Sequence, residues 1–154
     1  MTPIIKEAGI VNVNFGENVQ VVTPLNLYGC TIGSNCFIGP FVEIQNGVLV
    51  GENCRIQSHS FICELVTIGS DCFIGHGVMF INDVFKIGKP AAGDKAKRKS
   101  TQIGNHVSIG SNATILPVSI CDGVVIGAGA VVTKDIDKPG IYAGNPAKFI
   151  RVIE

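Results

Sequence analysis

The stretches Ile32-Gly-Ser-Asn-Cys-Phe37, Val50-Gly-Glu-Asn-Cys-Arg55 and Ile68-Gly-Ser-Asp-Cys-Phe73 are three copies of one pattern, set 18 residues apart. A shorter period lies within it, because a bulky apolar residue returns at every sixth position from 32 to 80 without interruption. Neither a helix nor one isolated strand has a period of six that lasts this long. Self-similarity at a fixed period is typical of a solenoid, so this repeat decides the fold.

Each six-residue unit supplies two inward side chains and a turn. A glycine commonly follows the bulky residue, where a tight bend or a close backbone approach requires it. Four residues after the bulky position comes a small or β-branched residue, such as Cys36, Val42 or Cys54. We therefore predict one short strand and one corner per unit, with three strands in each triangular coil. Stacked coils would pair through parallel ladders about 4.8 Å apart.

The six cysteines are not spaced like a disulfide framework. Cys36, Cys54 and Cys72 are separated by 18 residues, so we expect them to stack inside one corner of the solenoid. In that position they would be small, buried and reduced residues. No Cys-x-x-Cys pair occurs that could begin a zinc site, and we expect no metal cofactor.

Charge and hydropathy exclude some classes of partner. The chain has 154 residues with 12 basic and 12 acidic side chains, so neither nucleic acid nor a membrane surface is expected as a partner. No apolar run approaches the ~20 residues that span a bilayer. The start of the chain has no basic lead and no long apolar stretch, unlike a secretory signal. We expect one soluble, cytoplasmic domain over residues 1–154.

The period breaks once, in an insertion over about residues 83–102, within coils that span about 13–137; a C-terminal tail covers 138–154. Long loops in compact folds are often functional or disordered. Two interpretations stay open, a solvated flap and a basic arm that covers a phosphate-bearing ligand at a subunit interface. The insertion holds half of the basic residues of the chain, namely Lys86, Lys89, Lys95, Lys97, Arg98 and Lys99.

The repeat resembles the hexapeptide signature of left-handed parallel β-helix acyltransferases, over about residues 13–137 and the tail. This resemblance implies an all-β fold, a left-handed parallel β-helix, although parallel crossovers in general favour the right hand. It also implies a homotrimer whose active sites lie between neighbouring subunits. Large apolar residues expected on the outside, such as Phe37 and Phe73, fit an assembly better than a monomer.

The tail resembles the closing motif of acetyltransferases that use acetyl-CoA as co-substrate. The matching stretches are Ile126-Gly-Ala-Gly-Ala130 and Pro139-Gly-Ile-Tyr-Ala-Gly-Asn-Pro-Ala-Lys148. In that family the pantetheine arm lies along a coil edge and is held largely by backbone groups. The glycines and alanines could instead serve the corners of the coil alone. By the resemblance, the coenzyme groove is lined by Gly110, Ala128, Ala130, Lys134, Asn145, Pro146 and Lys148.

The segment Phe80-Ile-Asn-Asp83 resembles the Phe-Thr-Asn-Asp of N-acetyltransferases that act on nucleotide-linked 3-amino-sugars, with Ile81 in place of the usual threonine. The Thr-x-x-His-Pro element of sugar O-acetyltransferases is missing. The resemblance implies a dTDP- or UDP-linked amino-sugar acceptor, with Asn82 orienting the amine and Asp83 binding a sugar hydroxyl. Glu43 and Asn46 match a polar segment near the sugar site of that family, or form an exposed corner.

Acyl transfer needs a group that accepts the proton of the nucleophile, and histidine suits that role near neutral pH. His76 is our candidate base because it precedes the insertion, and His59 is expected one coil away, nearly beneath it, as a substrate-binding residue. The alternative is an O-acetyltransferase with His76 or His106 as base. A zinc enzyme of the carbonic-anhydrase type would need a His-x-x-x-x-His pair, which is missing.

Overall fold

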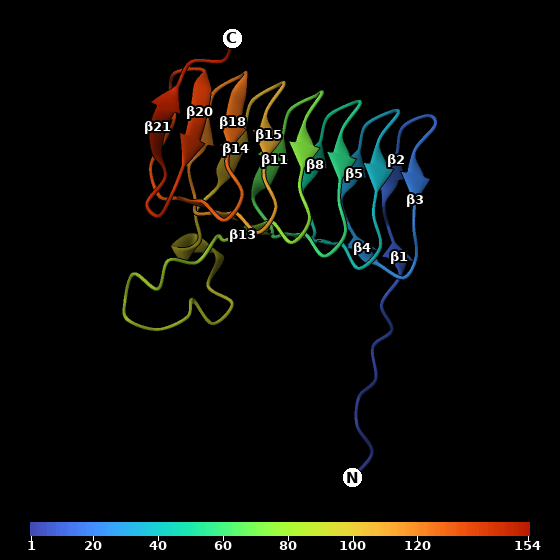
Figure 1. Cartoon of the computed structure of the whole chain (residues 1–154). Coiled ribbons are helices and arrows are strands. Elements are labelled where there is room, and N and C mark those ends of the chain that lie inside the picture. Colours follow the sequence, from blue (N-terminus) through green and yellow to red (C-terminus); the bar gives the residue numbers. More distant parts are fainter.

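Three parallel sheets wind around one axis and form a triangular solenoid (Figure 1). The protein is described by a computed structural model over residues 1–154. The sheets contain 21 short strands, and the one helix is a 3-10 turn, η1 (Lys95–Lys97). None of the helical structure is long and apolar enough to cross a membrane. The predicted parallel β-helix of hexapeptide units is confirmed.

We name the three sheets faces A, B and C. Face A contains β1 (Ile10–Val11), β4 (Asn26–Tyr28), β7 (Glu43–Ile44), β10 (Phe61–Ile62), β13 (Met79–Phe80), β16 (Thr114–Ile115) and β19 (Val131–Val132). Face B contains β2 (Asn14–Phe15), β5 (Thr31–Ile32), β8 (Leu49–Val50), β11 (Val66–Ile68), β14 (Thr101–Ile103) and β17 (Ser119–Ile120). Face C contains β3 (Gln20–Val21), β6 (Phe37–Ile38), β9 (Arg55–Ile56), β12 (Phe73–Ile74), β15 (Ser108–Ile109), β18 (Val124–Ile126), β20 (Gly140–Ala143) and β21 (Lys148–Arg151).

The register follows the 18-residue period of the sequence. Phe37 pairs with Arg55, and Arg55 pairs with Phe73, so equivalent residues of successive coils lie directly above one another. All strand pairs are parallel except β20 and β21, which form an antiparallel hairpin at the C-terminal end. The strands begin at Ile10, slightly before the expected first coil.

The core is a column of fully buried isoleucines, such as Ile38, Ile56 and Ile74, with the predicted cysteine ladder beside it. Cys36, Cys54 and Cys72 are buried, and all six cysteines of the chain are free thiols. The three ladder thiols reach carbonyl oxygens of the neighbouring coil at 3.1–3.2 Å. Their side chains therefore fill the interior of the corner between faces B and C.

The insertion projects from the body of the solenoid (Figure 1). The chain leaves face A after Phe80 and returns to face B at Thr101, so residues 81–100 lie outside the strands. The insertion therefore hangs from the corner between faces A and B. The N-terminal residues before β1 also extend away from the coils (Figure 1).

Candidate functional site

The corner between faces C and A, which we call the C–A edge, carries a column of unpaired backbone amides. This part of the C–A edge consists of the turns at residues 57–60, 75–78, 110–113 and 127–130. The residues Ser58, His76, Ser111 and Ala128 stack there, because the face C strands before them are paired in register. Their backbone N–H groups donate to no other group of the protein. Backbone donors require a partner, so a ligand or water must satisfy them.

The corner between faces B and C, the B–C edge, shows that such amides need not be free. Serine, asparagine and aspartate side chains of one coil accept hydrogen bonds from equivalent amides of the coil before it, at 2.7–3.1 Å. Four of the six amides at that position are capped in this way, those of Glu17, Glu52, Ser70 and Asn105. The uncapped column of the C–A edge is therefore a property of that edge, and not of the coil in general.

His76 lies within the amide column. Its Nδ1 is 2.8 Å from the Oγ of Ser58, which occupies the equivalent position one coil earlier. In the tautomer with a proton on Nδ1, the ring donates to Ser58 and leaves Nε2 free to accept a proton. The predicted neighbour His59 is also at this edge, but Ser58 takes the place directly beneath His76. The His59 ring instead packs 4.8 Å from the Phe41 ring.

The predicted coenzyme residues divide between the edge and the core. Ala128 is exposed at the C–A edge. Gly110 lies one coil below, next to Ser111, and an added Cβ would approach the Ala128 nitrogen at 2.5 Å, so coil stacking alone requires this glycine. Ala130 is fully buried in the core. The prediction that the Ala130 side chain lines a groove is therefore wrong.

The C-terminal turn continues the C–A edge. The carbonyl of Gly144 accepts from the amide of Val131 at 2.9 Å, and the amide of Ala147 donates to Val131 at 2.8 Å. These bonds hold Asn145 and Pro146 above the column, and Lys148 begins β21 just beyond. Lys134 follows β19 on the side of the A–B edge, across face A from the C–A edge. Within one chain, Lys134 therefore lies away from the other predicted coenzyme residues.

Asn82 stands at the base of the insertion, at the corner between faces A and B, the A–B edge. Its Nδ2 donates to the backbone carbonyl of Glu64 at 3.0 Å, and its Oδ1 accepts no hydrogen bond within the chain. The Glu64 carboxylate pairs with Arg98 at 2.7 Å and with Lys95 at 3.6 Å. Glu64 therefore ties both the start and the end of the insertion to the coils. Sequence reasoning missed this residue, although it lies one 18-residue period before Asn82.

Asp83 organises the insertion. Its Oδ2 accepts the amide of Ala91 at 2.7 Å and its Oδ1 accepts the amide of Phe85 at 3.0 Å. These two hydrogen bonds, with that from Ala91 the stronger, lower the pKa of the Asp83 carboxyl. Both carboxylate oxygens are thus engaged in shaping the loop, which gives Asp83 a structural role beside the predicted contact with a sugar hydroxyl.

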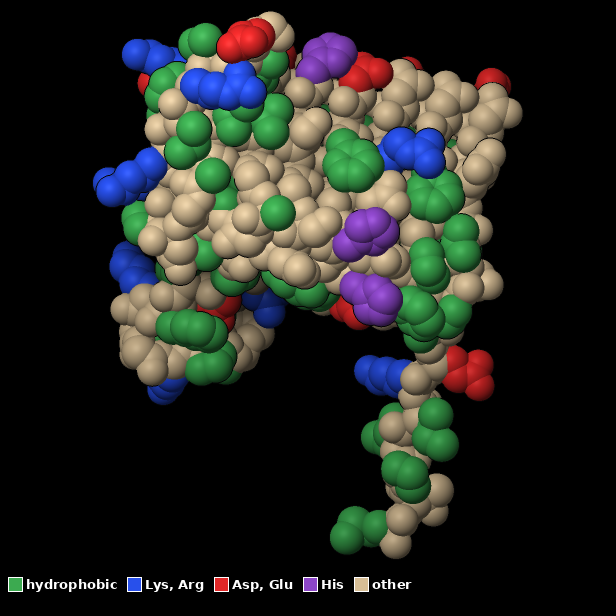
Figure 2. Space-filling view, viewed as in Figure 1, with side chains coloured by type: hydrophobic (Ala, Val, Ile, Leu, Met, Phe, Trp, Pro, Cys, Tyr) green, Lys and Arg blue, Asp and Glu red, His purple; other side chains and the backbone are tan.

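His76 precedes the insertion in the sequence, but within a single chain it does not lie beside it. His76 precedes β13 and Asn82 follows it, so the two residues lie at opposite ends of that strand, on different edges. His106 lies on the third edge, with its Nδ1 3.9 Å from the Asp71 carboxylate. Two of the histidines lie close together on the face seen in Figure 2, and the third stands apart beside an acidic side chain.

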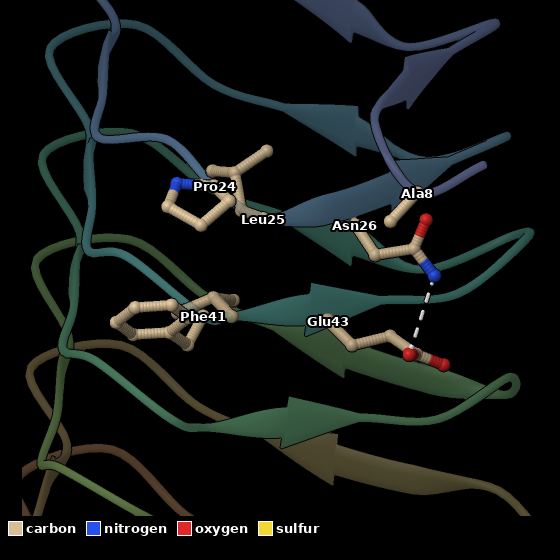
Figure 3. Close-up of a pocket in the computed structure, with 7 residues that line it drawn as sticks. Ala8, Pro24, Leu25, Asn26, Phe41 and Glu43 are labelled. Atoms are coloured by element: carbon tan, nitrogen blue, oxygen red, sulfur yellow. Dashed lines mark hydrogen bonds between the residues drawn. The ribbon is translucent and has the colours of Figure 1, made fainter.

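Face A and the A–B edge carry two hollows and the remaining predicted residues. A hollow of about 270 Å³ contains Glu43 in its wall (Figure 3), and one of about 320 Å³ is lined in part by Phe61, Asn82 and Arg98. Asn46 is exposed at the A–B edge, below Glu64. No three His, Cys, Asp or Glu side chains converge in a way that could hold a metal ion.

Two segments of the solenoid match models of known protein families. Residues 29–64 match the model described as bacterial transferase hexapeptide (six repeats), and residues 100–134 match the hexapeptide repeat of succinyl-transferase. The chain therefore carries hexapeptide repeats like those of bacterial transferases. Both matched segments consist of coils, one on each side of the insertion, so this hexapeptide-repeat protein keeps its repeat across the break.

The relatives of this hexapeptide-repeat protein include named acetyltransferases. It is 31% identical over 144 residues to the bifunctional protein GlmU of Acidithiobacillus ferrooxidans. This match covers 87% of this chain and 31% of GlmU. It is 36% identical over 124 residues to a probable macrolide acetyltransferase of Lysinibacillus sphaericus. This match covers 78% of this chain and 61% of that protein. The chain thus spans about a third of GlmU and less than two thirds of the second relative.

Among solved structures, the hexapeptide-repeat protein resembles the D94A mutant of AntD, an N-acyltransferase from Bacillus cereus in complex with dTDP and coenzyme A. The TM-score is 0.75 at 23% sequence identity, and the match covers 92% of this chain and 84% of AntD. At this identity the likeness establishes the fold.

Proposed function

We propose that the protein transfers an acetyl group from acetyl-CoA to the amine of a nucleotide-linked 3-amino-deoxy sugar, with dTDP or UDP as the nucleotide. The observation that carries the proposal is the column of unpaired amides at the C–A edge, with His76 among them. An extended pantetheine arm presents amide and thioester carbonyls. A row of N–H donors with a repeat of about 4.8 Å is a suitable surface for such an arm.

The chemistry follows from this placement. The acceptor amine attacks the thioester carbon, the N–C bond forms, and the C–S bond breaks to release the coenzyme thiolate. The proton lost by the amine passes to Nε2 of His76, while column amides such as those of Ser111 and Ala128 stabilise the developing oxyanion. Binding both substrates in one groove orients the amine for attack.

Transfer is direct, without a covalent acyl-enzyme. A cysteine nucleophile would have to be an accessible thiolate. Five of the six cysteines are buried, and burial raises the pKa of the Cys63 thiol to about 11. None of the three histidines forms a hydrogen bond with a cysteine. The cysteines therefore fit a structural role.

Asn82 orients the acceptor through its free Oδ1, beside the hollow that contains Arg98. Since His76 and Asn82 lie at opposite ends of β13, we propose a homotrimer in which the insertion of one copy meets the C–A edge of the next. The bound dTDP and coenzyme A named for AntD support an acceptor of this kind.

A second candidate is acetyl transfer to a hydroxyl with His76 as base. The hydrogen bond between Ser58 and His76 favours this candidate, because a hydroxyl depends more on a base than an amine does. The variant of this alternative that uses His106 gains no support, since His106 lies on the B–C edge, away from the column, with its Nδ1 3.9 Å from the Asp71 carboxylate.

The test compares two acceptors that differ at one atom. Thiol release from acetyl-CoA is followed with dTDP- and UDP-linked 3-amino-deoxy sugars and with the 3-hydroxy counterparts. We expect rapid release with an amino-sugar, slow release with its hydroxyl counterpart, and a large loss with the Asn82→Ala variant. Release with the hydroxyl compound alone would replace the proposal by the second candidate. Full activity of the variant would remove Asn82 from the site.

A further inference from the structure

The C–A edge changes one coil below His76. Ser58 is the lowest residue of the amide column, and Pro40 occupies the equivalent position in the coil beneath it, because β6 and β9 pair in register. Proline has no backbone N–H. An extended arm that is held by the column therefore meets no further donor at Pro40.

The residue that follows each column residue also changes at this point. Its φ is positive, between 60° and 69°, in five successive coils, at Phe41, His59, Gly77, Asn112 and Gly129. The three upper coils have glycine or asparagine there, which adopt this left-handed conformation readily. The two lower coils have an aromatic ring there, and we call Phe41 and His59 the ring pair.

The conformation of Phe41 is unfavourable for its residue type. A bulky residue with a positive φ is rare, and strained residues of this kind gather at active sites and ligand contacts. Phe41 is also 55% exposed, so core packing does not explain it. Its ring lies 4.8 Å from that of His59, and Pro24 stands in the coil beneath it (Figure 3). The edge below His76 is therefore filled with rings.

The proposed function sets the direction from which the coenzyme meets the ring pair. The tail residues Asn145 and Pro146 lie above the column, and His76 lies near its lower end. An arm that enters at the tail therefore runs down the edge toward His76. The acyl group is on the far side of the thioester from the arm, so it points on toward His59.

The space available to the acyl group is about one coil. Successive coils are about 4.8 Å apart and a carbon–carbon single bond is about 1.5 Å long, so about three such bonds fit between the level of His76 and that of His59. An acetyl group fits within this space. A hexanoyl chain would reach the rings and push the thioester up the edge, out of register with the amides.

We infer that the ring pair ends the coenzyme groove below His76 and limits the donor to acyl groups of about four carbons or fewer. The inference rests on the proposed function for the presence of the coenzyme, and it adds the residues that select the acyl group. The turns at residues 110–113 and 127–130 carry no ring, so they leave room for the arm.

The experiment measures the binding of donors and not catalysis. The full-length protein is titrated by calorimetry with acetyl-, butyryl-, hexanoyl- and octanoyl-CoA in the absence of an acceptor. We expect octanoyl-CoA to bind about tenfold or more weakly than acetyl-CoA, with the decline between butyryl- and hexanoyl-CoA. Equal affinities, or tighter binding of the longer chains, would overturn the inference.

The His59→Gly variant tests the ring pair directly. Glycine accepts the positive φ of this position, so the fold should be kept while the upper ring is removed. The affinity for hexanoyl-CoA should then approach that for acetyl-CoA. The matched control is His106→Gly, which removes an exposed histidine with a φ of 54° from the B–C edge and should keep the wild-type order of affinities. An unchanged order in His59→Gly would remove the ring pair from the groove.

The outcome is separable from that of the proposed function. A preference for short thioesters without acetyl transfer to any acceptor would support the ring pair and contradict the transferase proposal. Acetyl transfer by a protein that binds all four thioesters equally would contradict the ring pair and leave the transfer chemistry standing. No binding of any thioester would overturn both.

Discussion

At His76, the partner supplied by the neighbouring coil defines the chemistry of the ring. The sequence predicted this histidine as a base from its place before the insertion, and Ser58 was not part of that prediction. The 18-residue register stacks Ser58 beneath it, with 2.8 Å between Oγ and Nδ1. Spacing alone could have suggested the pair, because 58 and 76 differ by one period.

We expect His76→Asn to lower kcat by about 10²–10⁴-fold, because the variant loses the proton acceptor of the transfer step. The Michaelis constant for acetyl-CoA should change little, since the amide column remains. The control is His106→Asn, which removes an exposed histidine from the B–C edge and should leave kcat at the wild-type value. A loss of less than about threefold in His76→Asn would mean that the amine binds neutral and that solvent takes the proton.

The buried cysteines make stability depend on alkaline pH. Burial raises the pKa of Cys63 from 9.0 to about 11 in the folded protein. Between these two values the folded chain binds more protons than the unfolded chain, so the free energy of unfolding falls as pH rises. The stabilisation is fully present below pH 9 and is lost as pH rises through about 11.

Urea denaturation at pH 8, 9, 10 and 11 measures this dependence. Other groups whose pKa values are raised in the folded protein also contribute to the pH dependence of the free energy of unfolding. The informative quantity is therefore the difference in this dependence between the wild type and Cys63→Ala. We expect the variant to show the smaller decline between pH 9 and 11. Parallel declines would mean that the Cys63 thiol ionises as readily in the folded chain as in the unfolded chain.

At the scale of elements, the strands could be predicted from the sequence and the path of the insertion could not. A six-residue period needs only local pattern to place each strand and corner. The insertion is held by single contacts, such as that of Arg98 with Glu64 on the coils and that of Ala91 with Asp83 within the loop. Such contacts have no period, so the basic composition of the loop did not reveal that Arg98 and Lys95 are already paired.

We expect Glu64→Gln to loosen the insertion, because Arg98 and Lys95 would both lose their ion pair with a largely buried carboxylate. Trypsin should cleave the variant within residues 95–99 several times faster than the wild type, and the Michaelis constant for the acceptor should rise more than kcat falls. The control, Asp94→Asn, breaks the exposed pair with Lys97 and should change neither quantity, because exposed pairs contribute little. Equal cleavage of Glu64→Gln and wild type would contradict the role of Glu64 as an anchor.

At the scale of the whole molecule, the residues that the resemblance assigns to the coenzyme do not all lie along one edge. Asn145 and Pro146 do reach the C–A edge, but Ala130 enters the core and Lys134 lies at the other end of face A. Residue type could not have predicted the amide column. Serines occur on both edges, yet those of the B–C edge cap an amide whereas Ser58 and Ser111 do not.

In the proposed trimer, each active site combines residues from two copies of the chain, and this can be tested by mixing inactive variants. His76→Ala and Asn82→Ala homotrimers should each be nearly inactive, because each site lacks one group. Unfolding and refolding an equal mixture should restore activity at about one quarter of the sites, if each site takes His76 from one copy and Asn82 from its neighbour. No recovery in a mixture that light scattering shows to be trimeric would place both residues of a site in the same chain.

The central claim is that the C–A edge holds the coenzyme through its backbone, and amide hydrogen exchange followed by NMR tests it directly. Coenzyme A should slow exchange at the N–H groups of Ser58, His76, Ser111 and Ala128, or at a contiguous part of this column. The amide of Ser34 is the internal reference, because it is unpaired at the equivalent position of the B–C edge and should exchange as before. Protection along the C–A column with Ser34 unchanged is the result we predict. Binding of coenzyme A that leaves all four amides exchanging freely, or no binding, would contradict the account.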